Sequence, residues 1–296
     1  MAKLHGIIPP LVTPLTADER IDAAGLERQL QRMLAGGVHG IFFLGSTGEA
    51  PALHADEKQR AIEIARGAIG DAVPLVVGCM ASGTSKAIEN IHQAVAGGAD
   101  YVAVTPPHYY PSAGPAEQLA HYRACVAASD VPLVIYNIPS TTKVMLSPET
   151  TAAIADLGGV AGLKDSSTDF SHFLRLLDRL GGRADFSVLI GSPILAGAAL
   201  LCGGDGAVPG IANLDPRLMA DIYETARTGD LECLKSMQSR LLSLFRVTSF
   251  GAPIACLKAA LELMGVCQGH CTAPLQPPSV AARDEIAAVL RQHGLL

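Results

Sequence analysis

Tryptophan is absent from this chain of 296 residues, and aromatic residues of all kinds make up only 4% of it. Charged residues are also few, at 17%, and the excess of acidic over basic side chains leaves a net charge of −6 at pH 7. Nucleic acids and anionic membrane surfaces attract clusters of lysine and arginine, so this balance excludes a general partner of either kind. Small molecules are the expected partners.

No apolar run reaches membrane-spanning length, and no long apolar segment precedes the first strand-like stretch at residue 6. We therefore expect a cytoplasmic globular protein. The seven cysteines are an odd number without a repeated spacing, which favours reduced, buried thiols over a disulfide framework. Cys267, His270 and Cys271 are close in sequence, but two thiols and one imidazole are an incomplete structural site, so no metal is expected.

Two hydrophobic patterns alternate along the chain. Short apolar runs with strand character are separated by stretches with helical spacing, and most helical stretches end at glycines suited to a left-handed cap. The strand-like runs cover residues 6–10, 40–45, 73–79, 101–106, 132–138, 160–164, 186–191 and 206–211. The helical stretches cover residues 24–34, 56–69, 86–96, 116–127, 148–155, 170–180, 194–201 and 217–226.

Strands that are apolar throughout must be covered on both faces, which predicts a parallel sheet. Eight successive strand–helix units most economically close into a (β/α)8 TIM barrel, an α/β fold. A doubly wound open sheet is the alternative, but no Gly-x-Gly-x-x-Gly follows the first run. Beyond residue 229 helical spacing at 231–245, 253–264 and 280–290 predicts a C-terminal three-helix appendage. The expected division is a catalytic barrel of residues 1–228 and a helical region of residues 229–296.

Residues 160–167 place a lysine where an apolar strand gives way to a loop. Lys164 ends the strand-like run, and Asp169 begins the next helical pattern. In barrel enzymes the chemistry lies at the C-terminal ends of the strands. Apolar walls there would desolvate the amine and lower its pKa from about 10.4, leaving free amine to attack a carbonyl and form a Schiff base. A surface lysine at a strand end is the alternative interpretation.

Three other strand ends carry polar residues. The second run ends in Gly45-Ser46-Thr47-Gly48-Glu49, whose hydroxyl and N–H donors suit a carboxylate, although a plain turn with a Ser or Thr N-cap has the same sequence. The fifth contains Tyr136, whose phenol could relay protons beside an imine-forming lysine or simply fill the core. The fourth is followed by His108 and Tyr109, for which aromatic loop packing is the alternative.

Together these motifs resemble a known family. The order and spacing of the motifs match over nearly the whole chain, in Gly45-Ser46-Thr47-Gly48-Glu49, Thr105-Pro106, Tyr136-Asn137-Ile138-Pro139 and Gly162-Leu163-Lys164-Asp165. The family is that of pyruvate-dependent class I aldolases and lyases, which contains dihydrodipicolinate synthase, N-acetylneuraminate lyase and the 2-keto-3-deoxygluconate and 4-hydroxy-2-oxoglutarate aldolases. The resemblance implies a homotetramer, a dimer of dimers. It implies no cofactor or metal, because the protonated imine is itself the electron sink.

The resemblance also implies a role for each site residue. Lys164 matches the Schiff-base lysine, and Tyr136 matches the tyrosine that relays protons and hydrogen-bonds the substrate. Ser46 and Thr47 match the residues that hold the pyruvyl carboxylate, with Thr47 also among the catalytic residues. The predicted substrate-binding set further includes Gly48, Thr141, Lys143 and Val208.

Three positions depart from the family pattern. His108, followed by Tyr109, stands where the family commonly has a tyrosine contributed across the dimer interface, so either residue could take its part in the proton relay. Thr141 stands where dihydrodipicolinate synthases have an arginine that binds the carboxylate of the second substrate. Lys143 stands at a family glycine, where it either adds a cation at the mouth of the site or points to solvent.

These departures favour one branch of the family. The missing arginine weakens a dihydrodipicolinate synthase assignment, and residues 191–194 lack the acidic side chains that N-acetylneuraminate lyases place after the seventh strand. Segments 250–253 and 271–276, together with Lys164-Asp165-Ser166, look most like those of the 4-hydroxy-2-oxoglutarate and keto-deoxy-sugar-acid aldolases. The expected activity is cleavage of a 2-keto-4-hydroxy acid or 2-keto-3-deoxy sugar acid to pyruvate and an aldehyde. The alternatives are 4-hydroxy-tetrahydrodipicolinate synthase, which condenses pyruvate with aspartate semialdehyde, and a non-catalytic keto-acid binder.

Overall fold

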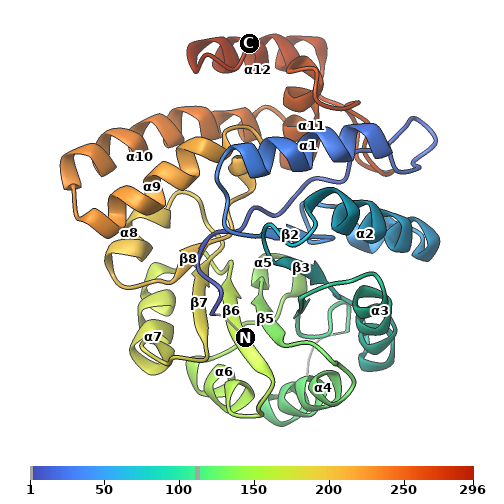
Figure 1. The fold of residues 1–296 in the computed structure, drawn as a ribbon, viewed down its shortest axis with the longest axis vertical. Helices are drawn as coiled ribbons and strands as arrows, with labels where there is room; N and C mark the ends of the chain where they lie inside the picture. Colours follow the sequence, from blue (N-terminus) through green and yellow to red (C-terminus); the bar gives the residue numbers. More distant parts are fainter. Residues whose placement is uncertain (1–2, 111–113) are drawn as a thin grey trace.

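The computed structural model describes residues 3–110 and 114–296, which form an eight-stranded parallel sheet surrounded by helices (Figure 1). Neighbouring strands pair in the order β1-β8-β7-β6-β5-β4-β3-β2. Strand residues are buried at nearly every position, as expected for strands covered on both faces. The strands are β1 (Gly6–Ile7), β2 (Ile41–Phe43), β3 (Leu75–Gly78), β4 (Tyr101–Val104), β5 (Leu133–Asn137), β6 (Val160–Asp165), β7 (Ser187–Ile190) and β8 (Gly206–Ala207).

The sheet closes into the predicted (β/α)8 barrel through residues just beyond β1. On one side β1 pairs with β8, and on the other Pro10 forms a parallel bridge with Phe42 of β2. The Leu11 N–H donates to the Phe42 carbonyl, and the Phe42 N–H donates to the Pro9 carbonyl, both at 2.9 Å. Prolines lack an N–H, so the ladder is interrupted here and β1 is short.

Every helical stretch predicted from spacing forms a helix, with ends within two residues of the prediction. Aspartate side chains accept hydrogen bonds from first-turn N–H groups at the starts of α1, α7, α9 and α10, which fixes where those helices begin. The barrel helices are α1 (Ala23–Ala35), α2 (Ala55–Ile69), α3 (Thr84–Ala96), α4 (Pro115–Ala127), α6 (Pro148–Ala155), α7 (Phe170–Leu180), α8 (Ala196–Leu201) and α9 (Pro216–Thr228).

Several strands are shorter than predicted, and β1 and β8 most of all, with the run of residues 6–10 forming only Gly6–Ile7. The expected run of residues 206–211 forms only the two-residue strand β8, and Gly210–Asn213 forms the short helix η2. Pro209 lies between them and has no N–H for the ladder. The sequence also missed α5 (Pro139–Thr142), η1 (Ala50–Ala52) and η3 (Arg246–Ser249), which are too short to show a hydrophobic period.

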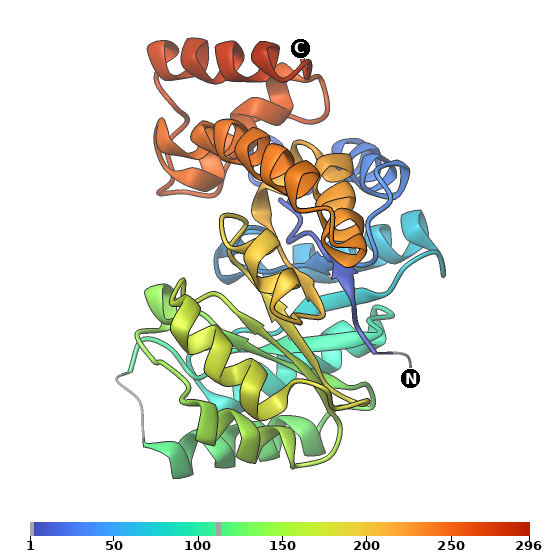
Figure 2. The same ribbon diagram turned by 90° about the vertical axis from the view of Figure 1, so that its left-hand side faces the viewer.

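The chain ends in the three helices predicted for the appendage, α10 (Leu231–Phe245), α11 (Pro253–Leu263) and α12 (Val280–Gln292). They gather at one end of the molecule beside α1 and α9, far from α4 and α6 (Figures 1 and 2). Within the described ranges no single helix is long and apolar enough to cross a membrane. Two consecutive helical segments, Leu231–Ser249 and Pro253–Leu263, are together long and apolar enough for a span, but the chain bends by 105° between them.

A buried histidine on α4 makes the fold sensitive to pH. His121 Nε2 lies 3.2 Å from the Thr105 carbonyl oxygen, and Nδ1 lies 3.0 Å from Thr84 Oγ1. A carbonyl only accepts, so Nε2 carries the proton and Nδ1 accepts from the threonine hydroxyl. Burial lowers the pKa of His121 below its ordinary 6.5, opposed in part by the Thr105 carbonyl. The folded protein therefore holds this side chain neutral.

We expect the free energy of unfolding to fall as the pH drops below about 6.5, because the unfolded chain then binds a proton at His121 that the folded chain does not. Above that pH both states are neutral and the contribution is fully present. The loss should reach up to ~1.4 kcal/mol per pH unit for this side chain. Urea unfolding at pH 7.5 and 5.5 measures it, with His121→Gln as the non-titrating comparison. Equal losses in both proteins would contradict the prediction.

Candidate active site

Lys164 lies one residue before the end of β6, in contact with two aromatic rings. Its side chain is 3% exposed, and Nζ lies 4.0 Å from the centre of the Tyr136 ring and 4.2 Å from that of Phe42. The pairing of β5 with β6 sets Tyr136 directly beside Lys164. Phe42 belongs to β2, on the opposite side of an eight-stranded barrel, so its contact with Lys164 crosses the barrel interior.

This environment favours the neutral amine. Burial lowers the pKa of Lys164 below its ordinary value, and the nearby Tyr136 hydroxyl opposes part of the shift. Among the described residues no ion pair joins Lys164 to a carboxylate that would restore the charge. A buried lysine with free amine at this position is a competent nucleophile toward a carbonyl carbon.

Tyr136 connects the lysine to the turn that follows β2. Its side chain is 2% exposed, and its hydroxyl lies 3.5 Å from Ser46 Oγ, at the limit of a hydrogen bond. Its ring meets Phe42 edge-on, with 5.5 Å between ring centres. The structure thus brings together the amine, the phenol and the serine hydroxyl from three separate strand ends.

The turn of residues 45–49 is not a simple helix cap. The Gly48 N–H donates to the Gly45 carbonyl and the Glu49 N–H donates to the Ser46 carbonyl, both at 3.1 Å. The helix that follows is η1, whose N-cap is Glu49, and α2 begins only at Ala55. Ser46 and Thr47 therefore cap neither helix, and both are partly exposed and free to face a ligand.

A polar network that the sequence motifs did not predict lies beside the lysine. Asp165 follows Lys164, Asn137 follows Tyr136, and strand pairing places these two residues side by side. Asn137 Nδ2 donates to Asp165 Oδ1, and Ser167 Oγ donates to Asp165 Oδ2, both at 2.7 Å. Burial raises the pKa of Asp165, and these two donors oppose the shift. Because the two strands are tied at the next residue, Lys164 and Tyr136 are held in register.

The loop after β4 holds the predicted relay candidates. His108 is partly buried, which lowers its pKa, whereas the Tyr109 side chain is 85% exposed. Tyr109 has a φ of 81°, a left-handed conformation uncommon for a bulky residue. Its ring packs edge-on against Tyr110, 5.2 Å away. Within the described residues no hydrogen bond or ring contact joins His108 or Tyr109 to Lys164.

The remaining predicted site residues lie beyond the ends of β8 and β5. Val208, just beyond β8, is 2% exposed, and its N–H donates to the Ile190 carbonyl at 2.8 Å. Thr141 and Lys143 lie in and after the short helix α5, and both are exposed. Lys143 has a φ of 60°, which explains why a glycine suits this position, and its Nζ donates to the Ser140 carbonyl at 2.6 Å.

The cysteine-rich segment near the C-terminus has little metal-ligand character. Burial raises the pKa of Cys267 to about 12 and that of Cys271 to about 11, so both thiols stay protonated. The described residues contain no group of three or more His, Cys, Asp or Glu side chains arranged to hold a metal ion. Cys267 contributes to the hydrophobic core instead.

A (β/α)8 barrel with a buried lysine of lowered pKa at a strand end is typical of enzymes that form Schiff bases with carbonyl compounds. Residues 3–293 match the dihydrodipicolinate synthetase family. An uncharacterized DapA-like lyase of Halobacterium salinarum is 36% identical over 99% of this chain and 95% of its own length. A 4-hydroxy-tetrahydrodipicolinate synthase of Acidiphilium cryptum is 35% identical over 99% of both chains.

The fold agrees with these sequence relationships. The dihydrodipicolinate synthase structure from Bacteroides thetaiotaomicron superimposes with a TM-score of 0.94 at 32% identity, covering 99% of this chain and 100% of the other. The chain therefore belongs to the dihydrodipicolinate synthetase family. It is a pyruvate-dependent carbon–carbon lyase that acts on small molecules. The family resemblance and the barrel fold predicted from the sequence are confirmed.

Proposed function

We propose that this lyase reversibly cleaves a 2-keto-4-hydroxy acid or a 2-keto-3-deoxy sugar acid to pyruvate and an aldehyde. The observation that carries the choice of substrate is Thr141, which stands where a synthase would bind the second carboxylate with arginine. The nearest cation in the same turn, Lys143, is exposed and its ammonium donates to the Ser140 carbonyl. A second carboxylate would therefore lack a bidentate partner here.

In the proposed reaction Lys164 Nζ attacks the C2 carbonyl of the keto acid, and loss of water gives an iminium ion. The C3–C4 bond then breaks, its electron pair moves into the iminium to form an enamine, and the C4 hydroxyl loses its proton as the aldehyde leaves. Tyr136, 3.5 Å from Ser46 Oγ, carries that proton and returns one to C3. Hydrolysis of the new imine releases pyruvate and regenerates the amine.

The other predicted residues have supporting parts in this proposal. Ser46 and Thr47 bind the keto-acid carboxylate through their partly exposed hydroxyls, and Gly48 shapes the turn that presents them, with its N–H donating to the Gly45 carbonyl. Val208 limits the pocket beside them. His108 or Tyr109 continues the proton path toward solvent. The left-handed backbone at Tyr109 supports its candidacy, since strained residues cluster at functional sites.

Comparing two specificity constants tests the substrate assignment. Losing a charge-assisted pair in a partly desolvated pocket costs on the order of 2–5 kcal/mol, or roughly 30- to 4,000-fold in selectivity. We expect kcat/KM for pyruvate release from 4-hydroxy-2-oxoglutarate or a keto-deoxy sugar acid to exceed that for condensation with aspartate semialdehyde by at least about tenfold, a cautious part of that range. Both are measured on one preparation.

A better constant with aspartate semialdehyde would overturn the assignment. It would favour 4-hydroxy-tetrahydrodipicolinate synthase, the activity named for the relative from Acidiphilium cryptum. Lys143 would then be the residue to replace next, because a rearranged α5 could bring its ammonium to the pocket. A non-catalytic keto-acid binder is disfavoured by the buried amine beside a phenol, which binding alone does not need.

A metal chelator should leave turnover unchanged, because the iminium accepts the electron pair that a metal or cofactor would otherwise stabilise. Steady-state rates before and after dialysis against EDTA measure this. Dialysis without chelator is the control. Activity lost with chelator and restored by one divalent ion would contradict the prediction.

We also propose a homotetramer, a dimer of dimers, located in the cytoplasm. Two sets of exposed apolar side chains support assembly. Tyr109 and Tyr110 are 85% and 69% exposed in the loop after β4. Ile194, Leu201 and Leu231 are 45%, 46% and 59% exposed around a shallow hollow between α8 and α10.

We also propose that the chain divides at residue 229, with the barrel as the catalytic unit and the helical region as a separate part.

A further inference from the structure

A buried ion pair joins the turn of residues 45–49 to the C-terminal helical region. Glu49 is 4% exposed and Lys258, in the middle of α11, is 0% exposed, and Glu49 Oε1 pairs with Lys258 Nζ. Lys258 Nζ also donates to the His270 carbonyl at 2.8 Å. Removing one partner of an ion pair this deeply buried strongly destabilises a protein, because the other charge is left buried and unpaired. The pair therefore holds the turn of residues 45–49 and α11 together.

Thr272 completes the arrangement on the other carboxylate oxygen. Its N–H donates to Glu49 Oε2 at 2.7 Å, and its hydroxyl donates to the same oxygen at 2.8 Å. Glu49 therefore receives its partners from two places in the C-terminal region, α11 and the segment that follows it. We refer to Glu49, Lys258 and Thr272 as the carboxylate anchor.

The segment that carries Thr272 is itself fastened to the barrel. Leu15, in the loop after β1, forms a parallel bridge with Gly269. In the same loop Glu19 Oε1 accepts from the Ala273 N–H at 2.8 Å. The loop after β1 and the turn after β2 are thus both held by residues 269–273. These contacts give a structural role to part of segment 271–276, which the sequence motifs related to the aldolases without indicating what it does.

The anchor acts directly beside the proposed ligands of the keto-acid carboxylate. Glu49 has a φ of 56°, and its N–H donates to the Ser46 carbonyl. The preceding carbonyl, of Gly48, accepts from Thr13 Oγ1 at 2.7 Å. Ser46 and Thr47 directly precede Gly48 and Glu49 in this turn. A shift of the Glu49 side chain would therefore pass along the backbone, through Gly48, to the residues that carry the two hydroxyls.

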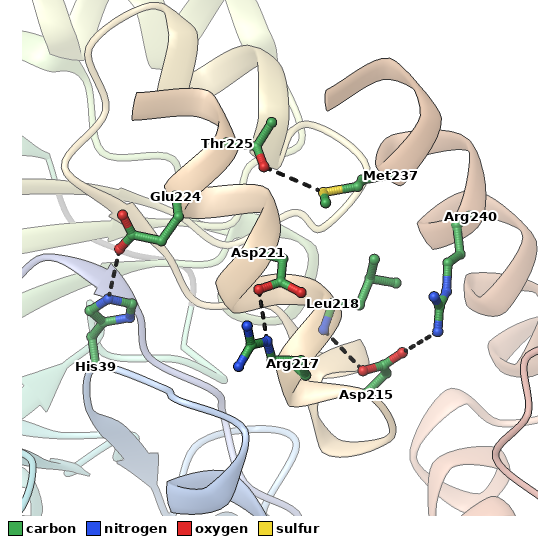
Figure 3. A network of polar contacts seen from close by, with 9 residues as sticks. All are labelled: His39, Asp215, Arg217, Leu218, Asp221, Glu224, Thr225, Met237 and Arg240. Atoms are coloured by element: carbon green, nitrogen blue, oxygen red, sulfur yellow. Dashed lines mark hydrogen bonds and ion pairs between the residues drawn. The ribbon is translucent and has the colours of Figure 1, made fainter. Parts of the chain in front are cut away.

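We propose that Glu49, Lys258 and Thr272 are positioning residues, through which the C-terminal helical region sets the affinity of the site for the pyruvyl carboxylate. The inference rests on the proposed binding of that carboxylate by Ser46 and Thr47. The competing explanation is that these contacts only stabilise the packing of the C-terminal helical region on the barrel. Asp215 and Arg240 provide a contact of that kind, since their ion pair of 3.1 Å joins the start of α9 to α10 (Figure 3).

Trapping of pyruvate with borohydride tests the proposal, because it needs no aldehyde and so does not depend on the second substrate. The half-saturating pyruvate concentration, the maximal trapped fraction and the melting temperature are measured for each variant. We expect Lys258→Met to raise half-saturation by at least about tenfold, with the trapped fraction nearly unchanged. Thr272→Val, which removes one hydroxyl and keeps the N–H, should raise it by about three- to tenfold. Arg240→Met should leave it within about twofold.

A double variant separates position from charge. Glu49→Gln combined with Lys258→Met removes both charges, and the glutamine carbonyl can still accept from Thr272, so half-saturation should return toward the wild-type value. If the anchor variants lower only the melting temperature, the fastening is structural and the inference is overturned. Thr272→Val decides this even if Lys258→Met fails to fold. A preference for aspartate semialdehyde would overturn the proposed substrate alone, since pyruvate is common to both reactions.

Discussion

Lys164→Met is expected to lower kcat/KM by more than about 10⁴-fold and to abolish the adduct that pyruvate and borohydride form with the protein, because no other group replaces a covalent nucleophile. Methionine preserves most of the side-chain length and fits between Phe42 and Tyr136, so the barrel should remain folded. Intact-mass analysis before and after reduction measures the adduct, and peptide mapping locates it.

Two other lysines provide the controls for this experiment. Lys143 is exposed, and Lys143→Met should retain the adduct. Lys258 is fully buried and forms an ion pair with Glu49, so its side chain is inaccessible to pyruvate. An adduct mapped to either residue, or none in the wild type, would refute the assignment of Lys164.

Tyr136→Phe should lower turnover by about 10²–10⁴-fold, the usual contribution of a positioned acid–base group. The pyruvate adduct should still form, because the ring that packs against Lys164 remains. Loss of the hydroxyl also removes the contact of 3.5 Å with Ser46 Oγ, so a modest rise in half-saturating pyruvate accompanies the loss of rate. Single-turnover cleavage compared with borohydride trapping separates the two effects.

Tyr122→Phe is the matched control for Tyr136→Phe. Tyr122 lies on α4, outside the barrel interior, and is also fully buried. Its hydroxyl donates to the Val104 carbonyl at 3.0 Å. Loss of one buried hydroxyl there should lower stability without changing turnover per folded molecule. Similar rates for wild type and Tyr136→Phe would return Tyr136 to the role of a core aromatic.

The fold was predictable because its signals are local. Apolar runs such as Leu75–Gly78 and amphipathic stretches such as Phe170–Leu180 record which faces must be buried, and each can be recognised within a few residues. Their regular alternation leaves few topologies for a parallel sheet. The prediction failed where Pro209 stops β8, because a missing N–H outweighs the apolar character of the following residues.

The candidate site was predictable in part for the same reason. Lys164, Tyr136 and the turn of residues 45–49 stand at strand ends, and parallel strands bring those ends to one face. The Asn137–Asp165 contact could have been predicted by aligning β5 and β6 in register. The burial of Lys164 against Phe42 could not, because it depends on strands at opposite sides of the barrel.

By itself, the sequence determined the order of strands and helices, the barrel and the strand-end positions of the amine, the phenol and the hydroxyls. Only the tertiary structure decided how strongly Lys164 is desolvated and which groups support the turn beside it. Glu49 and Thr272 are 223 residues apart, and no local pattern relates a carboxylate to a threonine at that distance. Burial and partner choice are properties of the packed chain, because they depend on what the rest of the molecule places around each side chain.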